Sequence, residues 1–269
     1  MKKLAIFSLL VLMVAVAPAI SRADVTQSDR LLQRPEWDGA VMPSPWLDGG
    51  LTYEKWENDS YKADVWSLGG TFITSLKAVP QLELGTRLDI MNYDPNYSGS
   101  ETGLSDIDAW GKYQVYKDSQ VLVSAGLLVT LPTGSDEIVH PHASGEFNAE
   151  VFGAARYQAN RLLALIGHLA LRQNNDMDVK INNTTSRVDG KTQMAMGGGV
   201  IYQVNSQLNV QGELNFATEA YDDFENDIQL RGGLEYKLDR HLALRGGLSI
   251  GLADGAPDWA LTFRCAYLF

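Results

Sequence analysis

The sequence predicts an all-β fold: a transmembrane, antiparallel, up-and-down β-barrel of about twelve strands with both termini on the periplasmic side. Three observations support this prediction. The last segment alternates apolar and polar residues and ends on an aromatic residue. The first residues have the pattern of an export signal, and about twelve alternating segments are joined by connections that are short and long in turn.

The last segment, Trp259–Phe269, has the clearest strand pattern. Its odd-numbered residues are apolar or aromatic, whereas Thr262 and Arg264 are even-numbered. Because side chains alternate along a strand, one face is apolar and the other polar. Such an edge would promote aggregation in a soluble sheet, whereas in an outer-membrane barrel the apolar face contacts lipid. The terminal Phe269 resembles the signal that the bacterial barrel-assembly machinery reads, which makes that machinery an expected partner.

The first residues indicate export. Lys2 and Lys3 precede an apolar run over residues 4–17, and residues 21–23 place small side chains where signal peptidase reads them. We therefore predict a signal peptide over residues 1–23 and a location in the bacterial outer membrane. The apolar run is too short to cross a bilayer as a helix, and no later segment approaches the roughly 20 apolar residues that a transmembrane helix needs.

Composition narrows the possible functions. The chain has a net charge of −11, which becomes −14 without Lys2, Lys3 and Arg22, so nucleic acid is not an expected partner. A mean hydropathy of −0.14 fits a barrel whose strands are only half apolar. Cys265 is the single cysteine, which excludes an internal disulfide, and we expect it to face lipid.

Twelve segments alternate as strands do, each about ten to fifteen residues long, which is enough for a tilted strand to cross a membrane. The predicted strands are Trp46–Trp56, Ala63–Thr74, Gln81–Tyr93, Leu104–Tyr116, Gln120–Leu131, Gly145–Gln158, Leu162–Gln173, Lys191–Val204, Gln207–Thr218, Asn226–Leu238, His241–Leu252 and Asp258–Phe269.

The connections differ systematically in length. Short turns lie at 117–119, 159–161, 205–206 and 239–240, and the connections between them are long and polar, as over 174–190. Short turns face the periplasm in outer-membrane barrels and long loops face outward, which with an even strand count puts both termini in the periplasm. The tyrosines beside the short turns fit an interfacial aromatic girdle: Tyr116, Tyr157, Tyr202 and Tyr236.

Residues 24–44 are polar and do not alternate. We interpret them as a periplasmic leader, either disordered or tucked into the lumen, that precedes a barrel over residues 45–269.

The inward face of the predicted barrel carries charges of both signs. Twelve strands enclose a space between the filled interior of eight strands and the wide channel of sixteen. The charges either pair into stabilising networks or form opposed acidic and basic rows at a constriction. The candidate pore residues are Glu54, Arg87, Asp89, Asp106, Asp108, Lys112, Arg156, Arg172, Glu213, Arg231, Glu235, Arg245 and Arg264.

Three of these candidates form a predicted pattern. Arg231, Arg245 and Arg264 lie on the last three strands, whose spacing of about 5 Å would make them a basic ladder. A ladder of like charges repels itself, so we expect carboxylates opposite, among them Glu54 and Glu213.

Two stretches carry a family resemblance. Residues 103–113 read GLSDIDAWGKY, and residues 125–134 read AGLLVTLPTG. Together they resemble the signature of outer-membrane transporters known as the MetA-pathway of phenol degradation family, although Ser105 stands where that family usually has glycine. The resemblance implies a barrel that passes small molecules, often aromatic or hydrophobic.

The main prediction is therefore an outer-membrane channel or transporter for small solutes, with lipid and lipopolysaccharide as its surroundings. One alternative is a structural or adhesive outer-membrane barrel without a transport role. A more remote one is a barrel lipid hydrolase, because His142 and Ser144 faintly resemble the His-x-Ser arrangement of outer-membrane phospholipase A.

Catalysis needs a base and a hydroxyl held in fixed geometry, and a loop beside Pro141 is a poor place for that. We therefore predict no enzymatic activity and no cofactor. His140 and His142, with Asp136 and Glu137, would be metal ligands by type, but a solvated loop is the simpler interpretation, and no metal is predicted.

Deleting Phe269 should lower the amount of barrel inserted into the outer membrane, because the last strand would lose its terminal aromatic residue. Immunoblots of outer-membrane fractions measure the yield, with Phe269→Tyr as the control that keeps an aromatic end. A normal yield of the truncated protein would contradict the prediction.

Overall fold

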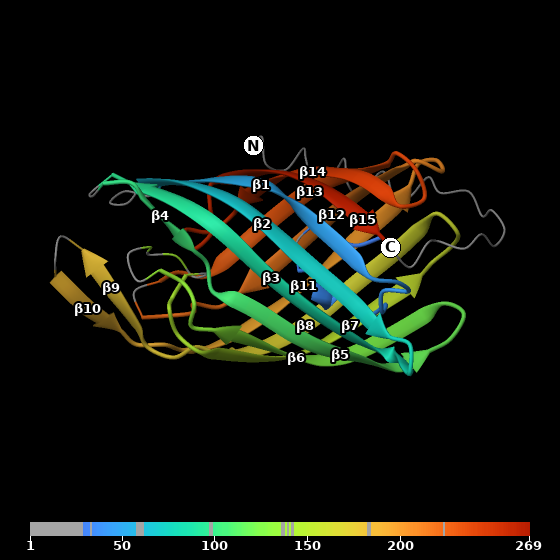
Figure 1. Ribbon diagram of the computed structural model, residues 1–269, viewed down its shortest axis with the longest axis horizontal. Helices are drawn as coiled ribbons and strands as arrows, with labels where there is room; N and C mark the ends of the chain where they lie inside the picture. Colours follow the sequence, from blue (N-terminus) through green and yellow to red (C-terminus); the bar gives the residue numbers. More distant parts are fainter. Residues whose placement is uncertain are drawn as a thin grey trace.

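The computed structural model describes residues 29–32, 34–57, 62–96, 99–135, 138, 140, 143–181, 184–222 and 224–269. The predicted signal peptide lies outside these residues. Within them, twelve long antiparallel strands form one closed barrel, and no helix is long and apolar enough to cross a membrane (Figure 1). The barrel strands are β1 (Trp46–Glu57), β2 (Lys62–Leu76), β3 (Val79–Pro95), β5 (Ile107–Lys117), β6 (Val121–Leu131), β7 (Asn148–Gln158), β8 (Leu163–Gln173), β11 (Thr192–Gln203), β12 (Leu208–Ala217), β13 (Asp227–Lys237), β14 (Leu242–Gly251) and β15 (Trp259–Leu268).

The first and last strands close the barrel. β1 pairs with β2 on one side and with β15 on the other, from Trp46 opposite Leu268 to Lys55 opposite Trp259. Each of the twelve strands therefore has a hydrogen-bonded neighbour on both sides, as a structure in lipid requires. The prediction of a twelve-stranded antiparallel barrel is confirmed, with strand bounds close to those expected.

The two faces of the wall differ as the alternation predicts. Along β13, Leu234 and Tyr236 are exposed on the outside, whereas Glu235 between them is buried. Arg231, which has the same parity as Glu235, is also buried. The outward residues of other strands are also large and apolar, and Phe263 and Leu127 are more than 60% exposed. This outer band is the surface that faces hydrocarbon in a membrane barrel.

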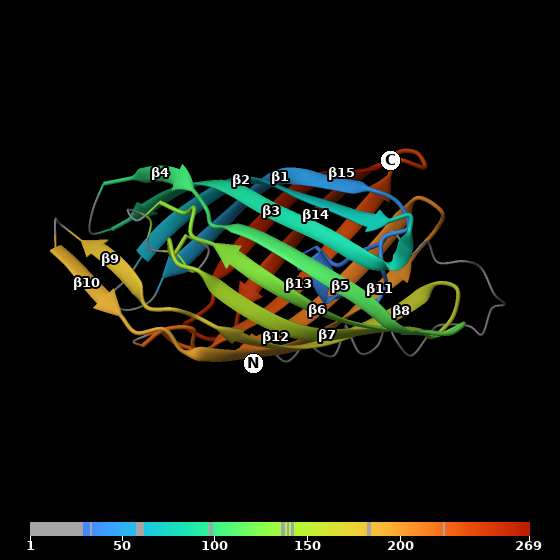
Figure 2. The ribbon, with the colours of Figure 1, turned by 60° about the horizontal axis from the view of Figure 1, so that its bottom comes forward.

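The long connection at 174–190 contains structure that the sequence analysis did not anticipate. β9 (Met177–Ile181) and β10 (Thr184–Val188) form a hairpin that projects beyond the barrel at the end opposite the C-terminus (Figures 1 and 2). Its base is tied to the neighbouring loop by an isolated bridge between Gly190 and Tyr221. Val188 packs there against buried Met177 and Tyr221.

The predicted strand Leu104–Tyr116 is interrupted. β4 (Glu101–Leu104) and β5 both pair with β3, but the register shifts between them. Ser105 fills the gap by accepting a hydrogen bond from the Asp89 amide on its hydroxyl at 2.9 Å and donating its own amide to the Asp89 carbonyl at 2.8 Å. Asp106 is thereby placed at the interruption rather than within a continuous ladder.

The orientation of the barrel can be tested by labelling. In a Cys265→Ala background, cysteines at Asn183 and Asp223, which lie outside the described residues in two long connections, should react with an impermeant maleimide on intact cells. A cysteine at Asp239 in the short β13–β14 turn should not, because we expect that turn to face the periplasm. Reaction of the cysteine at Asp239 alone would show that the barrel has the opposite orientation in the membrane.

Candidate functional site: the barrel lumen

A stretch of chain that precedes β1 occupies the barrel interior (Figure 1). We call residues 29–32 and 34–42 the lumen segment; it contains one short 3-10 helix, η1 (Pro35–Trp37). Arg30, Ala40 and Met42 of this segment are at most 1% exposed. The described part of the leader therefore lies within the lumen, and its contacts define the site.

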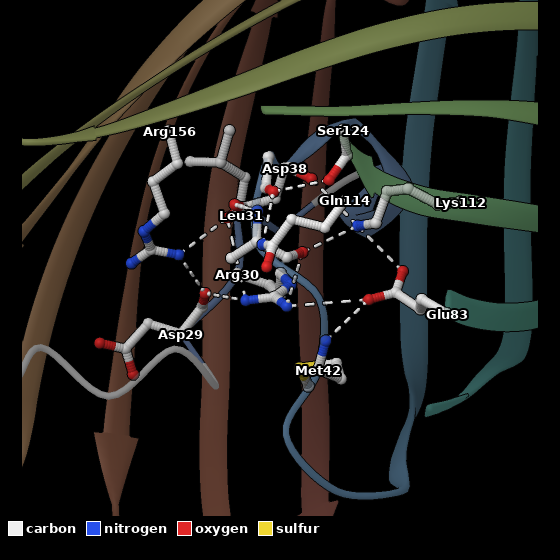
Figure 3. Close-up of polar contacts among 12 residues, drawn as sticks. Asp29, Arg30, Leu31, Asp38, Met42, Glu83, Lys112, Gln114, Ser124 and Arg156 are labelled. Carbon is white, nitrogen blue, oxygen red and sulfur yellow. Dashed lines mark hydrogen bonds and ion pairs between the residues drawn. The ribbon is translucent and has the colours of Figure 1, made fainter. Parts of the chain in front are cut away.

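A lysine on β5, Lys112, contacts the lumen segment through several polar interactions (Figure 3). The Lys112 ammonium donates hydrogen bonds to the carbonyls of Asp38 and Ala40, both at 3.0 Å, and pairs with Glu83 on β3 at 2.9 Å. Glu83 in turn accepts a hydrogen bond from the Met42 amide at 2.9 Å. Lys112 and Glu83 are both 0% exposed, so each charge depends on the other and on these backbone groups.

The segment also brings its own charges into the lumen. The carboxylate of Asp38 pairs with Arg156 of β7 at 2.9 Å and lies 3.9 Å from the Arg30 guanidinium. Arg156 also donates to the Asp29 carbonyl at 3.0 Å, and Arg30 donates to the Ala40 carbonyl at 3.1 Å. Burying such charges costs free energy unless they are paired and hydrogen-bonded. Here the charges of the lumen segment and of the wall neutralise each other.

Glycines on both sides allow the segment to lie close against the wall. A Cβ atom on Gly39 would lie 2.4 Å from the Leu122 carbonyl oxygen, so only glycine fits this approach. In the opposite sense, Leu32 occupies space above two wall glycines, Gly233 and Gly247, whose added Cβ atoms would lie 2.2 and 2.3 Å from its side chain. The wall therefore has recesses that match this leucine.

The end of the segment that faces the long loops is held by an acidic residue of β7. Glu150 accepts hydrogen bonds from Arg34 at 2.7 and 2.8 Å and from the Trp37 indole at 3.0 Å. The Trp37 ring stacks on His168 of β8 with 4.0 Å between the ring centroids. The Arg34 guanidinium also lies over the Trp37 ring, with its central carbon 4.0 Å from the ring centroid. Arg34 adopts a left-handed backbone conformation, with φ of 51°, just before η1.

The predicted basic ladder is paired within the wall. Arg245 and Arg264 are cross-strand neighbours, and both contact Asp48 on β1, Arg264 at 2.9 Å. Arg245 also pairs with Glu235 at 3.3 Å, and Arg231 lies 3.9 Å from Glu213. The carboxylates therefore come from the adjacent strand or, for Arg245 and Asp48, from the next strand but one.

All thirteen candidate pore residues have their side chains on the inside. Four contact the lumen segment: Lys112, Arg156, Glu213 and Arg245. Glu235 pairs with Arg245. Eight line the two cavities beside the segment: Glu54, Arg87, Asp89, Asp106, Asp108, Arg172, Arg231 and Arg264.

Sequence reasoning did not single out Asp48 or the charges of the lumen segment. Asp48 was recognisable, because it has the same parity as Glu54 within the predicted strand Trp46–Trp56. The only sign of the segment's role was its content of paired opposite charges, such as Arg30 and Asp38, in a stretch without alternation.

A vestibule opens on the long-loop side of the segment. Arg34 and Trp37 line its inner end, and Trp56, Phe216 and Phe224 are among its outer lining residues. Its cavity volume of about 160 Å³ is comparable to the roughly 150 Å³ that accommodates a benzene-sized molecule. The site is therefore large enough for one small ring.

Polar groups lie between these aromatic residues. Arg172 donates hydrogen bonds to Asn174 at 2.9 Å and Thr130 at 3.0 Å, and it lines the vestibule together with Arg231. Burial raises the pKa of Tyr221 in the loop above, so its hydroxyl stays protonated. The vestibule thus combines ring surfaces with fixed donors and charges.

The residues on which the hydrolase and metal alternatives depend are only partly described by the structure. The Ser144 hydroxyl is buried and donates to Asp106 at 2.9 Å, while His142 lies outside the described residues. His140 faces Glu54 at 3.4 Å and packs edge-on against Trp56. Within the part of the chain that the structure describes, no cluster of three or more His, Cys, Asp or Glu residues could hold a metal ion.

Lys112→Met should destabilise the barrel by roughly 3–5 kcal/mol, because Glu83 would keep a buried charge without its nearest cation. Urea unfolding in lipid vesicles measures the change. The double variant Lys112→Met with Glu83→Gln is the control and should recover part of the loss. Equal stability of the wild type and Lys112→Met would show that this pair does not hold the segment.

Comparison with solved structures identifies the same architecture elsewhere. An outer membrane channel from Pseudomonas putida F1 superposes with a TM-score of 0.74 at 11% sequence identity, covering 89% of this chain and 100% of the other. The KdgM porin gives 0.51 at 11% identity over 83% and 99% of the two chains. The β domain of the Bordetella autotransporter BrkA gives 0.52 at 14% over 84% and 99%. Similarity at this level of identity establishes the fold.

No curated protein matches the chain in sequence. The sequence model of one family matches residues 47–269, which is nearly the whole barrel and includes both stretches that carry the resemblance. This protein belongs to the family described as the putative MetA-pathway of phenol degradation.

Proposed function

We propose that this protein is an outer-membrane channel that admits small molecules from the outside into the vestibule and passes them beside the lumen segment. The observation that carries the proposal is the vestibule itself, a ring-sized cavity in a barrel of membrane-protein type with the lumen segment beneath it. Cavities that combine apolar surface with fixed polar groups bind small molecules.

The lining favours small aromatic or hydrophobic solutes that carry a polar group. Trp37, Trp56 and Phe216 offer ring surfaces for stacking, and Arg172 and Arg231 offer hydrogen-bond donors beside them. The family description, which refers to phenol degradation, supports a solute of this class.

The same proposal includes a location and an orientation. Residues 1–23 act as a signal peptide, residues 24–44 form a leader whose later part is the lumen segment, and both termini face the periplasm. The C-terminal strand ending at Phe269 directs insertion by the barrel-assembly machinery, and lipopolysaccharide surrounds the outer rim. The outward apolar band and the outer-membrane neighbours support this placement. The thirteen inward residues line or shape the pore, and no catalytic step is assigned to them.

Two observations favour a barrel without a transport role. The lumen segment is held by a network of buried ion pairs, and the β9–β10 hairpin projects outside the barrel, where it would be accessible to partners. Conductance distinguishes this alternative from the channel.

The refolded mature protein should conduct ions in planar bilayers, and removal of residues 29–42 should increase the single-channel conductance severalfold because the segment fills the lumen. A deletion within the β9–β10 hairpin is the control and should leave conductance unchanged. Absence of current from both the wild type and the protein lacking residues 29–42 would favour the non-transport alternative.

A further inference from the structure

The lumen segment leaves unequal space on its two sides. Its polar and ring contacts join it to β3, β5, β6, β7, β8, β12, β13 and β14. Facing β15, β1 and β2, a second cavity lies between Leu32, Arg34 and Pro35 of the segment and the wall; we call it the side pocket.

Small polar side chains form part of the wall of the side pocket. Thr52 of β1 lies opposite Ser67 of β2 and Thr262 of β15, so three short side chains occupy one level of the wall. One level closer to the short-turn end, the facing residues are Gly50 and Gly69. The contrast with β5 and β7, where Lys112 and Arg156 reach across to the segment, explains why the space remains on this side.

The side pocket adjoins the vestibule. Arg34, Glu54 and His140 line both cavities, so these three residues lie where the two cavities meet. A route from the long loops down one side of the lumen would pass from one cavity to the other at this point.

The side pocket carries an excess of negative charge. Five carboxylates line it against three guanidinium groups. Asp48 and Asp108 are paired with arginines. Among the described residues, the carboxylate of Asp89 has no cation within ion-pair distance, although it faces the same cavity. A fixed unpaired carboxylate in a narrow passage attracts cations and repels anions.

The inner end of the side pocket is closed by an apolar collar, which we define as Met42, Trp46, Ile73 and Trp110. Trp46 lies opposite Ile73, two residues along each strand from the pair Asp48 and Thr71 that lines the pocket. All four collar residues are at most 4% exposed. A narrow apolar ring of this kind restricts the passage of hydrated ions.

We infer that solutes pass the lumen segment on one side only, through the side pocket, that Asp89 makes this path selective for small cations, including organic ammonium ions, and that the collar is its narrowest point. The inference rests on the proposed channel function and adds the route and the charge selectivity to it. Widening the collar should increase the current, and occupying the side pocket should reduce it.

Two matched cysteines test the route. In a Cys265→Ala, Ile73→Ala background, Ser67→Cys places a thiol in the side pocket, whereas Ser124→Cys places one under the segment, where the native hydroxyl donates to the Gly39 carbonyl at 2.7 Å. A methanethiosulfonate that carries a trimethylammonium group is added from the long-loop side. We expect Ser67→Cys to be modified and its current to fall by roughly twofold or more, and Ser124→Cys to be unaffected.

The charge is tested separately. Under a potassium chloride gradient, Asp89→Asn should move the reversal potential toward that of a non-selective pore. The control Asp178→Asn, at an exposed residue of β9, should not change the reversal potential. An unchanged reversal potential for Asp89→Asn would remove Asp89 as the selecting charge.

The outcomes separate the route from the channel function. Modification of Ser124→Cys but not Ser67→Cys, or modification of Ser67→Cys without loss of current, would overturn the side path while the protein still conducts. Lack of current from every variant, including the one without residues 29–42, would instead overturn the proposed channel.

Discussion

The ion pair between Lys112 and Glu83 is the interaction on which the interior depends. Both groups are removed from solvent and contact each other and the backbone of the lumen segment. Glu83 also lies 3.9 Å from the Arg30 guanidinium and accepts a hydrogen bond from the Trp110 indole at 3.4 Å. The energetic logic is that of a buried pair, weakly stabilising when complete and strongly destabilising when one member is lost. The segment therefore stabilises the barrel interior, because without it Lys112 would lose two carbonyl acceptors.

The same constraint explains the distribution of charge around the lumen. The segment carries charges of both signs, and the wall places an opposite charge beside them: Arg156 pairs with Asp38, and Glu150 pairs with Arg34. Where the segment does not reach, the wall pairs within itself, as Arg264 does with Asp48. The interior is thus a single electrostatic system, and the space left over, the vestibule and the side pocket, is lined by both paired and unpaired charges.

The strands of this fold follow from the sequence because the signal is local. Period-two alternation places each strand, and lipid on the outside makes the alternation strict, as in Trp259–Leu268. The interrupted strand at Ser105 and the β9–β10 hairpin were not predicted, because each depends on pairing with residues distant in the chain or within a polar loop.

The interior is less predictable for a physical reason. Alternation assigns Arg245 to the inside, but it does not say which carboxylate lies beside it, since that depends on the register and closure of the barrel. The lumen segment has no periodicity, and its conformation is set by the wall glycines and charges it contacts, such as Gly233 and Lys112.

Closure of the barrel has a consequence for the order of folding. Asp48 lies on β1, whereas its two arginine partners lie on β14 and β15, so this cluster forms only when the first strand meets the last. Arg245 of the same cluster also donates to the Arg30 and Leu31 carbonyls at 2.6 and 2.8 Å. The seam and the filling of the lumen are therefore coupled over more than 200 residues of sequence separation. Contacts this distant in sequence form late and slowly, so the barrel encloses its own N-terminal chain as it closes.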